Sequence, residues 1–188
     1  MFKSIKNNVL LQSLGIIFVF ISGISAQERT WKPFSPTNSN WTINAPGILK
    51  PDSEALKSSS DKGSYSYNDF TGFFVVIYRD SPKRWVPWKP DYPAYMRKNR
   101  DEAIKAVNGK LIRDDEFTNG NIKGREILIR MEGTTVRDRE SQTKITYRVE
   151  RARMFFNGKR FYVLLVVLPE DEINAPEITN YLNSFTFK

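Results

Sequence analysis

The sequence predicts an α+β domain, an α/β/α sandwich in which helices cover a central antiparallel sheet. Three observations predict it. Alternating or apolar runs typical of strands make up much of the chain. Two amphipathic segments, residues 91–109 and 174–188, have helical spacing and follow groups of strands. An Asn-Gly pair at residues 157–158 separates two long strand-like runs, which is a strong β-hairpin signal.

The amino-terminal residues have the pattern of a secretory signal peptide. Lys3 and Lys6 precede an apolar run from Val9 to Ile21, and small residues follow it. A membrane-spanning helix needs about 20 apolar residues, and this run is shorter. We therefore expect export to the periplasm or outside the cell, with cleavage after Ala26. The predicted organisation is a signal peptide (1–26), a polar leader (27–40) and one α+β domain (41–188).

The composition limits the chemistry of the chain. It contains no cysteine and no histidine, which excludes disulfides, thiolate catalysis, histidine-based acid–base catalysis and most zinc sites. We expect no cofactor, no metal site and no catalytic residue, although an enzyme that uses carboxylates, lysine or tyrosine stays open. The formal net charge is +8, and loss of Lys3 and Lys6 with the signal peptide leaves +6. This charge favours anionic partners and also keeps a small domain soluble.

The first half of the domain predicts strands and then a helix. A short strand around Ile43 is stopped by Pro46 and Gly47, and residues 48–63 predict a solvated loop. Residues 64–70 and 73–78 predict a hairpin whose second strand is apolar on both faces and therefore covered on both sides. In the helix that follows, Asp91 is the predicted N-cap and Asn108-Gly109 the predicted end.

The second half predicts four strands and a second cover helix. The strands are expected at residues 110–117, 122–132, 143–156 and 159–168. In the second of them, Gly124 is expected at a bulge or a close-packing position, and Arg125 and Glu126 as charges of a strand edge. Asn174 and Glu177 have the spacing of a capping box at the start of the last helix.

The Asn157-Gly158 pair also predicts a strand register. With these two residues at the centre of a type I′ turn, Met154 faces Phe161, and Arg153 faces Tyr162, which places that ring for a cation–π contact. Upstream, Ile145, Tyr147 and Val149 alternate out of phase with Ala152 and Met154, which predicts a bulge near Glu150.

The order of these elements resembles the PsbP-like family of exported bacterial proteins, whose fold is shared with the yeast Ran-binding nuclear import factor. The matching pieces are NWTINAPG, the Pro-containing loop before the first helix, NGKLIRDDEF, IKGREILIR, RARMFFNGKRFYVLLVV and YLNSFTFK, which span most of residues 41–188. The resemblance implies the α/β/α sandwich. It implies no activity, because the fold hosts binding and assembly proteins. The manganese-cluster role of the photosynthetic member is not expected, because this chain has no histidine.

Two surfaces are candidates for binding. The first is the stretch KRWVPWKPDYP, in which prolines keep the chain extended and we expect at least one tryptophan to pack inward; its candidate residues are Arg84, Trp85, Trp88 and Lys89. The second is the polar face of the predicted hairpin, which suits a carboxylate or phosphate; its candidate residues are Arg151, Arg153, Arg160 and Tyr162. The alternative for the second surface is that the arginine stems pack over the sheet while their charged groups reach water or pair with Glu150 and its neighbours.

These features predict an exported, non-enzymatic binding or assembly module that contacts a protein or envelope component. Two alternatives stay open: a histidine-free hydrolase with a cleft near Trp85–Pro93, and charge-driven binding of an anionic polymer. The acidic runs at residues 114–116 and 170–172 lack the spacing of a calcium loop, so we expect solvated strand ends there. Nucleic acid is an unexpected partner of an exported chain without a known binding motif. Membrane contact is expected only through an uncleaved signal segment.

Overall fold

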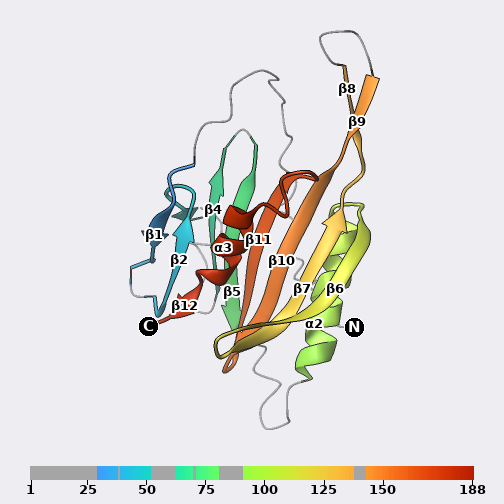
Figure 1. The fold of residues 1–188 in the computed structure, drawn as a ribbon. Coiled ribbons are helices and arrows are strands. Elements are labelled where there is room, and N and C mark those ends of the chain that lie inside the picture. Colours follow the sequence, from blue (N-terminus) through green and yellow to red (C-terminus); the bar gives the residue numbers. More distant parts are fainter. Residues whose placement is uncertain (1–28, 38, 52–61, 70, 81–90, 138–142) are drawn as a thin grey trace, which may run out of the picture.

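The computed structural model describes residues 29–37, 39–51, 62–69, 71–80, 91–137 and 143–188. At its centre lies a seven-stranded sheet in which every neighbouring pair is antiparallel (Figure 1). Its strands, in spatial order, are β3 (Lys50–Pro51), β4 (Lys62–Asn68), β5 (Phe73–Asp80), β11 (Arg160–Pro169), β10 (Arg148–Asn157), β7 (Ile122–Arg130) and β6 (Lys110–Asn119). The predicted antiparallel sheet is confirmed.

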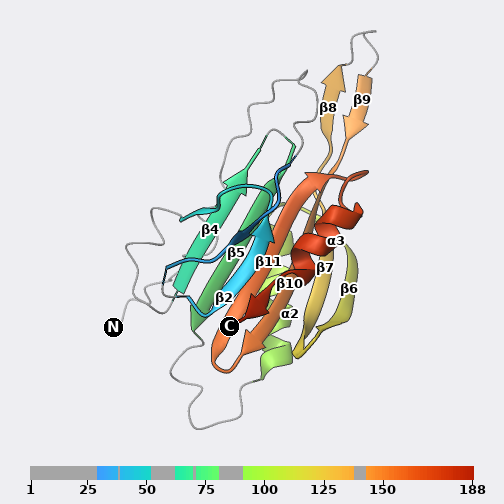
Figure 2. The ribbon, with the colours of Figure 1, turned by 60° about the vertical axis from the view of Figure 1, so that its left-hand side comes forward.

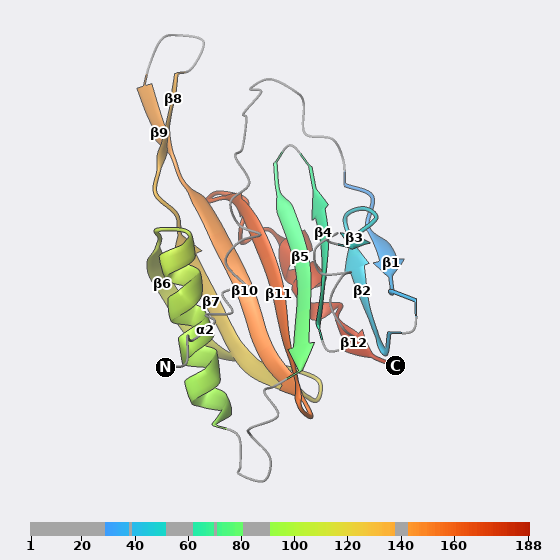
Figure 3. The same cartoon turned by 180° about the vertical axis from the view of Figure 1, so that it is seen from behind.

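The two faces of the sheet have different covers. Helix α2 (Tyr92–Ala106) packs on one face, over an apolar cluster that includes Ile127, Ile129 and Met154 (Figure 3). Helix α3 (Pro176–Asn183) covers the other face together with a three-stranded sheet of order β1-β2-β12 (Figure 2). The small strands are β1 (Lys32–Phe34), β2 (Trp41–Ala45) and β12 (Thr186–Phe187). Two helices were expected as covers, and the structure adds this small sheet to one of the two covering layers.

The segment expected to be a polar leader contributes to the fold from Arg29 onward. Trp31 packs edge-on against Phe74, with ring centroids 6.0 Å apart. Arg29 Nε donates a hydrogen bond to Asp69 Oδ2 at 3.0 Å. Apolar side chains within this polar stretch therefore tie it to the body of the domain.

The ends of the two helices test the predicted caps. Asp91 Oδ1 accepts a hydrogen bond from the Ala94 backbone N–H at 2.8 Å, which confirms it as the N-cap of α2. The N-cap of α3 is Ala175, and no side chain caps this helix. The capping box predicted for Asn174 and Glu177 is therefore wrong. Pro176, whose missing N–H suits the first helical position, begins α3 instead.

The β10–β11 hairpin has a different register from the predicted one. Its turn residues are Gly158 and Lys159, and Met154 lies opposite Val163 rather than Phe161. Gly158, at the first central position, has a φ of 58°, in the left-handed region that favours glycine. The shift moves each pairing by two residues, and therefore leaves every side chain on its predicted face.

The predicted bulge near Glu150 is absent. Strand β10 pairs without interruption with β7 and β11 from Val149 to Phe155. Val149 belongs to the apolar cluster under α3, whereas Ala152 and Met154 belong to the cluster under α2. Because both faces of β10 are buried, apolar residues of either parity are accommodated without a bulge. The irregularity that the sheet does contain lies in β6, between Leu111 and Arg113.

Strand β7 is internal to the sheet, between β6 and β10. The prediction that Arg125 and Glu126 are edge charges is therefore wrong, and the Glu126 side chain is buried. Close packing at Gly124 is confirmed, because a Cβ at this position would clash with the Met154 carbonyl oxygen and the Phe117 ring.

A two-stranded hairpin, β8 (Thr134–Arg137) and β9 (Thr143–Thr146), projects beyond the end of the main sheet (Figure 1). Strand β8 follows β7 in the chain and β9 precedes β10, so the hairpin extends these two neighbouring strands. In the described part of the chain, no helix has the length and apolar character needed to cross a membrane.

Candidate binding site

Strand β5 ends at Asp80 and α2 begins at Tyr92. The predicted residues Arg84, Trp85, Trp88 and Lys89 lie between these two elements, outside the described residues. The described residues at this end of the sheet come from β4, β5, the start of β11 and the first turns of α2. We call this region the Asp80 end. Two clusters of arginine and aromatic side chains lie there, one on each face of the sheet.

The first cluster surrounds Arg160. Cross-strand pairing places Arg160 opposite Asp80 and Tyr162 opposite Tyr78. Arg160 Nε donates a hydrogen bond to Asp80 Oδ1 at 2.6 Å, and its guanidinium lies 5.1 Å from the centroid of the Tyr78 ring. Tyr65 stacks on Tyr78, with ring centroids 6.4 Å apart. The Arg160 cluster is thus Tyr65, Tyr78, Asp80, Arg160 and Tyr162.

Two phenols of the Arg160 cluster, Tyr65 and Tyr162, are held in their protonated form. Burial raises the pKa of Tyr65, and the neighbouring Tyr78 raises it further. Burial also raises the pKa of Tyr162, although the charge of Arg160 and a hydrogen bond with it act in the opposite direction. Both hydroxyls therefore remain protonated at neutral pH. Tyr162 is 1% exposed, so its predicted position on an exposed face is wrong. The cluster offers donors and acceptors rather than a nucleophile.

The second cluster lies on the α2 face and surrounds Arg79. The Arg79 guanidinium lies 5.1 Å from the centroid of the Tyr95 ring and 5.6 Å from that of Phe161. Its Nη2 donates a hydrogen bond to Asn99 Oδ1. Asn99 Nδ2 in turn donates to the Tyr95 carbonyl oxygen at 2.8 Å. The Arg79 cluster is thus Arg79, Tyr95, Asn99 and Phe161.

The other two predicted arginines lie inside the protein. Arg151 and Arg153 are 6% and 7% exposed and share the carboxylate of Glu126 in β7. Burial acts to raise the pKa of Glu126, but hydrogen bonds and charge from these arginines outweigh it and hold that pKa below its ordinary value. Glu150, the predicted partner, lies on the opposite face of β10. We call the group of Glu126, Arg151 and Arg153 the Glu126 cluster.

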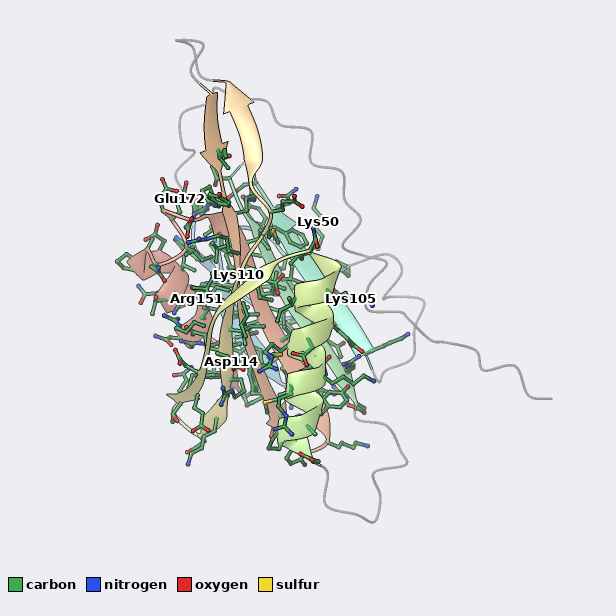
Figure 4. All side chains as sticks on the ribbon, turned by 90° about the vertical axis from the view of Figure 1, so that its right-hand side faces the viewer. Lys50, Lys105, Lys110, Asp114, Arg151 and Glu172 are labelled. Carbon is green, nitrogen blue, oxygen red and sulfur yellow. The ribbon has the colours of Figure 1, made fainter. Side chains whose placement is uncertain are left out.

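The Glu126 cluster also holds α3 against the sheet. Arg151 Nη1 donates to Thr179 Oγ1 at 3.1 Å, and Arg153 Nη1 donates to Asn183 Oδ1 at 2.7 Å. Figure 4 shows Arg151 on the α3 side of the sheet, away from α2. The donors of both guanidinium groups are therefore directed to groups of the chain itself.

The predicted contact between Arg153 and Tyr162 is wrong. The Arg153 guanidinium lies 4.8 Å from the centroid of the Phe117 ring, contributed by β6. Tyr162 lies opposite Phe155, and the two rings stack with centroids 5.4 Å apart and planes 9° apart. The two-residue change of register separates the side chains that the Asn-Gly turn would have paired.

Sequence reasoning missed seven residues of the two clusters at the Asp80 end: Tyr65, Tyr78, Arg79, Asp80, Tyr95, Asn99 and Phe161. The run Tyr78-Arg79-Asp80 at the end of an apolar strand was a usable signal, because charged and aromatic residues together are typical of a strand end near an interface. Asn99 had no such signal, since an asparagine within a charged helix predicts solvent exposure. Among the described residues, no three acidic side chains lie close enough together to hold a metal ion.

Comparison with solved structures shows which fold this is. The chain is similar to the solution structure of cyanobacterial PsbP (CyanoP) from Synechocystis sp. PCC 6803, with a TM-score of 0.57 and 11% identity, over 89% of this chain and 98% of that one. It also matches the crystal structure of PA94, a putative regulator from Pseudomonas aeruginosa, with a TM-score of 0.49 and 7% identity over 84% of this chain and 97% of that one.

A third match is the Saccharomyces cerevisiae Ran-binding protein Mog1p, with a TM-score of 0.48 and 11% identity over 85% of this chain and 96% of that one. No protein-family model matches the sequence, and no curated protein matches it. The predicted PsbP-like fold is therefore confirmed by the likeness to CyanoP. At 11% identity, the likeness to CyanoP shows the fold alone and leaves the activity to be argued from the residues.

Proposed function

We propose that this chain is an exported, non-enzymatic binding module that docks a protein partner of the cell envelope through the Asp80 end. The Arg160 cluster carries the proposal. It gathers an arginine, an aspartate and three tyrosines at the end of β5, directly before the chain segment that contains Arg84, Trp85, Trp88 and Lys89. Arginine, tyrosine and tryptophan are the residues enriched at the centres of protein interfaces.

The half-buried side chains of this cluster suit recognition. Tyr78 and Arg160 are partly exposed and held in place by ring and ion-pair contacts, so little conformational entropy is lost when a partner covers them. The Glu126 cluster, in contrast, supports the fold. The proposal therefore keeps Arg160 from the predicted hairpin surface. It assigns Tyr162, which is 1% exposed, to the packing against Tyr78, and Arg151 and Arg153 to the attachment of α3.

Crosslinked capture of a partner from the organism's own envelope fraction tests the proposal. The mature protein should capture a defined protein, and the variants Arg160→Gln and Trp85→Ala with Trp88→Ala should capture less while remaining folded. Lys105→Gln is the matched control, because Lys105 is exposed in the last turn of α2, about 20 Å along the helix from its start. Equal capture by all variants would exclude the Asp80 end as the docking surface.

A further inference from the structure

Two like charges face each other across β4 and β5. Lys62 pairs directly with Arg79 in the antiparallel register, so both side chains leave the same face of the sheet. Like charges at such positions repel each other, because their Cβ atoms are only about 5 Å apart. Among the described residues, no carboxylate lies within ion-pair distance of either side chain.

Arg79 differs in this respect from eight other described arginines. The arginines that form ion pairs with carboxylates are Arg29, Arg100, Arg113, Arg125, Arg130, Arg151, Arg153 and Arg160. Arg79 has the amide oxygen of Asn99 and two aromatic rings instead. Its Nε is buried without a hydrogen-bond partner in the described part of the chain. A desolvated cation that lacks a counter-ion is costly, so its retention calls for an explanation.

The surroundings of Arg79 orient the guanidinium. Asn99 is the buried polar residue of α2, and its amide is fixed at both ends, by Arg79 and by the Tyr95 carbonyl. Burial lowers the pKa of Arg79, and the neighbouring Tyr95 hydroxyl and Glu102 carboxylate only partly oppose this. An arginine remains cationic under these conditions, and a guanidinium held over a ring is preorganised to receive a planar anion. The helix thus uses a buried amide to hold a cation that forms no direct ion pair with a described carboxylate.

We propose that Lys62, Arg79 and Asn99 form a seat for one carboxylate group, supplied by an acidic side chain of the protein partner. The source of the carboxylate rests on the proposed function, whereas the seat itself rests on the geometry above. The carboxylate accepts hydrogen bonds from the Arg79 guanidinium and lies close to the Lys62 ammonium. It relieves the repulsion between the two cations and supplies the missing counter-charge.

Titration of the protein with acetate tests the seat. The arginine Nε–H signals and the Asn99 side-chain amide signal are followed by NMR while sodium acetate replaces sodium chloride at constant ionic strength. The signals of Arg79 and Asn99 should shift saturably in the wild-type protein. In Arg79→Gln, the apparent affinity read from the Asn99 amide should fall at least about tenfold, as loss of a charge-assisted hydrogen bond requires. The matched control is Arg97→Gln, which removes the same charge from an exposed position of α2 and should leave the response unchanged.

A second variant gives Arg79 a counter-charge from the protein itself. Asn99→Asp places a carboxylate at the position of the amide oxygen that Arg79 already contacts. It should raise the melting temperature and abolish the acetate response, because the seat is then filled. No acetate response in the wild-type protein, an equal response in Arg79→Gln, or a response retained by Asn99→Asp would overturn the seat. Tighter binding of inorganic phosphate than of acetate would overturn its assignment to a carboxylate.

The source of the carboxylate is tested separately by partner capture with Arg79→Gln. Reduced capture supports an acidic side chain of the partner, and undiminished capture overturns that source. If the wild-type protein captures no partner, the proposed function fails, and the acetate titration still decides whether the seat exists. The two failures are therefore distinguishable.

Discussion

Glu126 and Arg153 form an ion pair inside the protein, with Glu126 Oε2 2.6 Å from Arg153 Nε and both side chains 8% exposed. The second oxygen of the same carboxylate lies 3.0 Å from Arg151 Nη2. One carboxylate thus pairs with two buried guanidinium groups that also bind α3, and it accepts from Arg113 Nη2 at 2.6 Å as well. The stability of the α3 face depends on this single negative charge.

The substitution Glu126→Gln keeps the shape of the side chain and removes the charge. It should lower the free energy of unfolding by about 3 kcal/mol or more, because it leaves two buried cations uncompensated. Urea unfolding followed by tryptophan fluorescence measures the change. The control is Glu116→Gln, whose side chain is 87% exposed and lies 3.6 Å from Arg125; it should change the stability by about 0.5 kcal/mol or less. Similar losses in both variants would contradict the role given to Glu126.

Glu150 should make the stability depend on pH. This side chain is 2% exposed, and burial raises the pKa of its carboxyl group from 4.5 to about 7. The folded protein therefore binds one more proton than the unfolded chain between these two values. The stabilisation by that proton is fully present below the unfolded pKa and is lost as the pH rises through the folded pKa.

The variant Glu150→Gln removes this proton linkage. It should be more stable than the wild-type protein by roughly 3 kcal/mol at about pH 8, and the difference should nearly disappear at about pH 4. Urea midpoints measured across this range give the answer. Parallel curves for the two proteins would show that Glu150 has an ordinary pKa in the folded state.

Gly63 should be sensitive to a single added methyl group. Gly63 lies opposite Tyr78, and a Cβ at this position would be 2.5 Å from Tyr78 Cζ. Gly63→Ala should therefore displace the ring that carries the Arg160 guanidinium and cost about 1–3 kcal/mol. In a Tyr78→Ala background, the same substitution should cost nothing, since the ring is gone. A double-mutant cycle by chemical unfolding measures this coupling, and additive losses would argue against it.

Salt separates docking at the Asp80 end from simple charge attraction. Capture centred on Tyr78, Arg160 and neighbouring aromatic residues should persist when the ionic strength is raised. Binding of an anionic polymer by charge alone should fall steeply over the same range. Capture from the envelope fraction at increasing salt makes the comparison. Complete loss at modest salt would favour the polymer over the protein partner.

The sequence predicted the fold more fully than the register. Periodicity placed the main strands and both helices, because a buried face imposes its spacing directly on the residues. The local Asn-Gly signal placed the turn one residue too early in the chain. In the observed register, Phe155 lies opposite Tyr162 and Phe156 lies opposite Phe161. In the predicted register, Phe155 would have faced Arg160. Stacking of aromatic pairs across the strands therefore outweighs the turn preference.

The candidate site was only partly predictable, for a related reason. Alternation placed Arg151, Arg153, Arg160 and Tyr162 on one face, which is correct. It could not show that Glu126, distant in sequence, would lie beside two of these arginines in a buried layer. The same holds for Asn99 and Arg79, which meet only when α2 packs on the sheet. Long-range pairs of this kind carry no local signal in the sequence.

The close contact at Gly124 has a consequence for sequence divergence. Phe117 lies opposite this glycine in β6, with its ring in the space that a Cβ would need. The backbone of β10 closes the space from another side, through the Met154 carbonyl. In a diverging lineage, residue 117 can change without making room at position 124, because the Met154 carbonyl oxygen would still lie 2.1 Å from a Cβ there. We therefore expect glycine at 124 to persist in this family of folds even where the aromatic residue at 117 is lost.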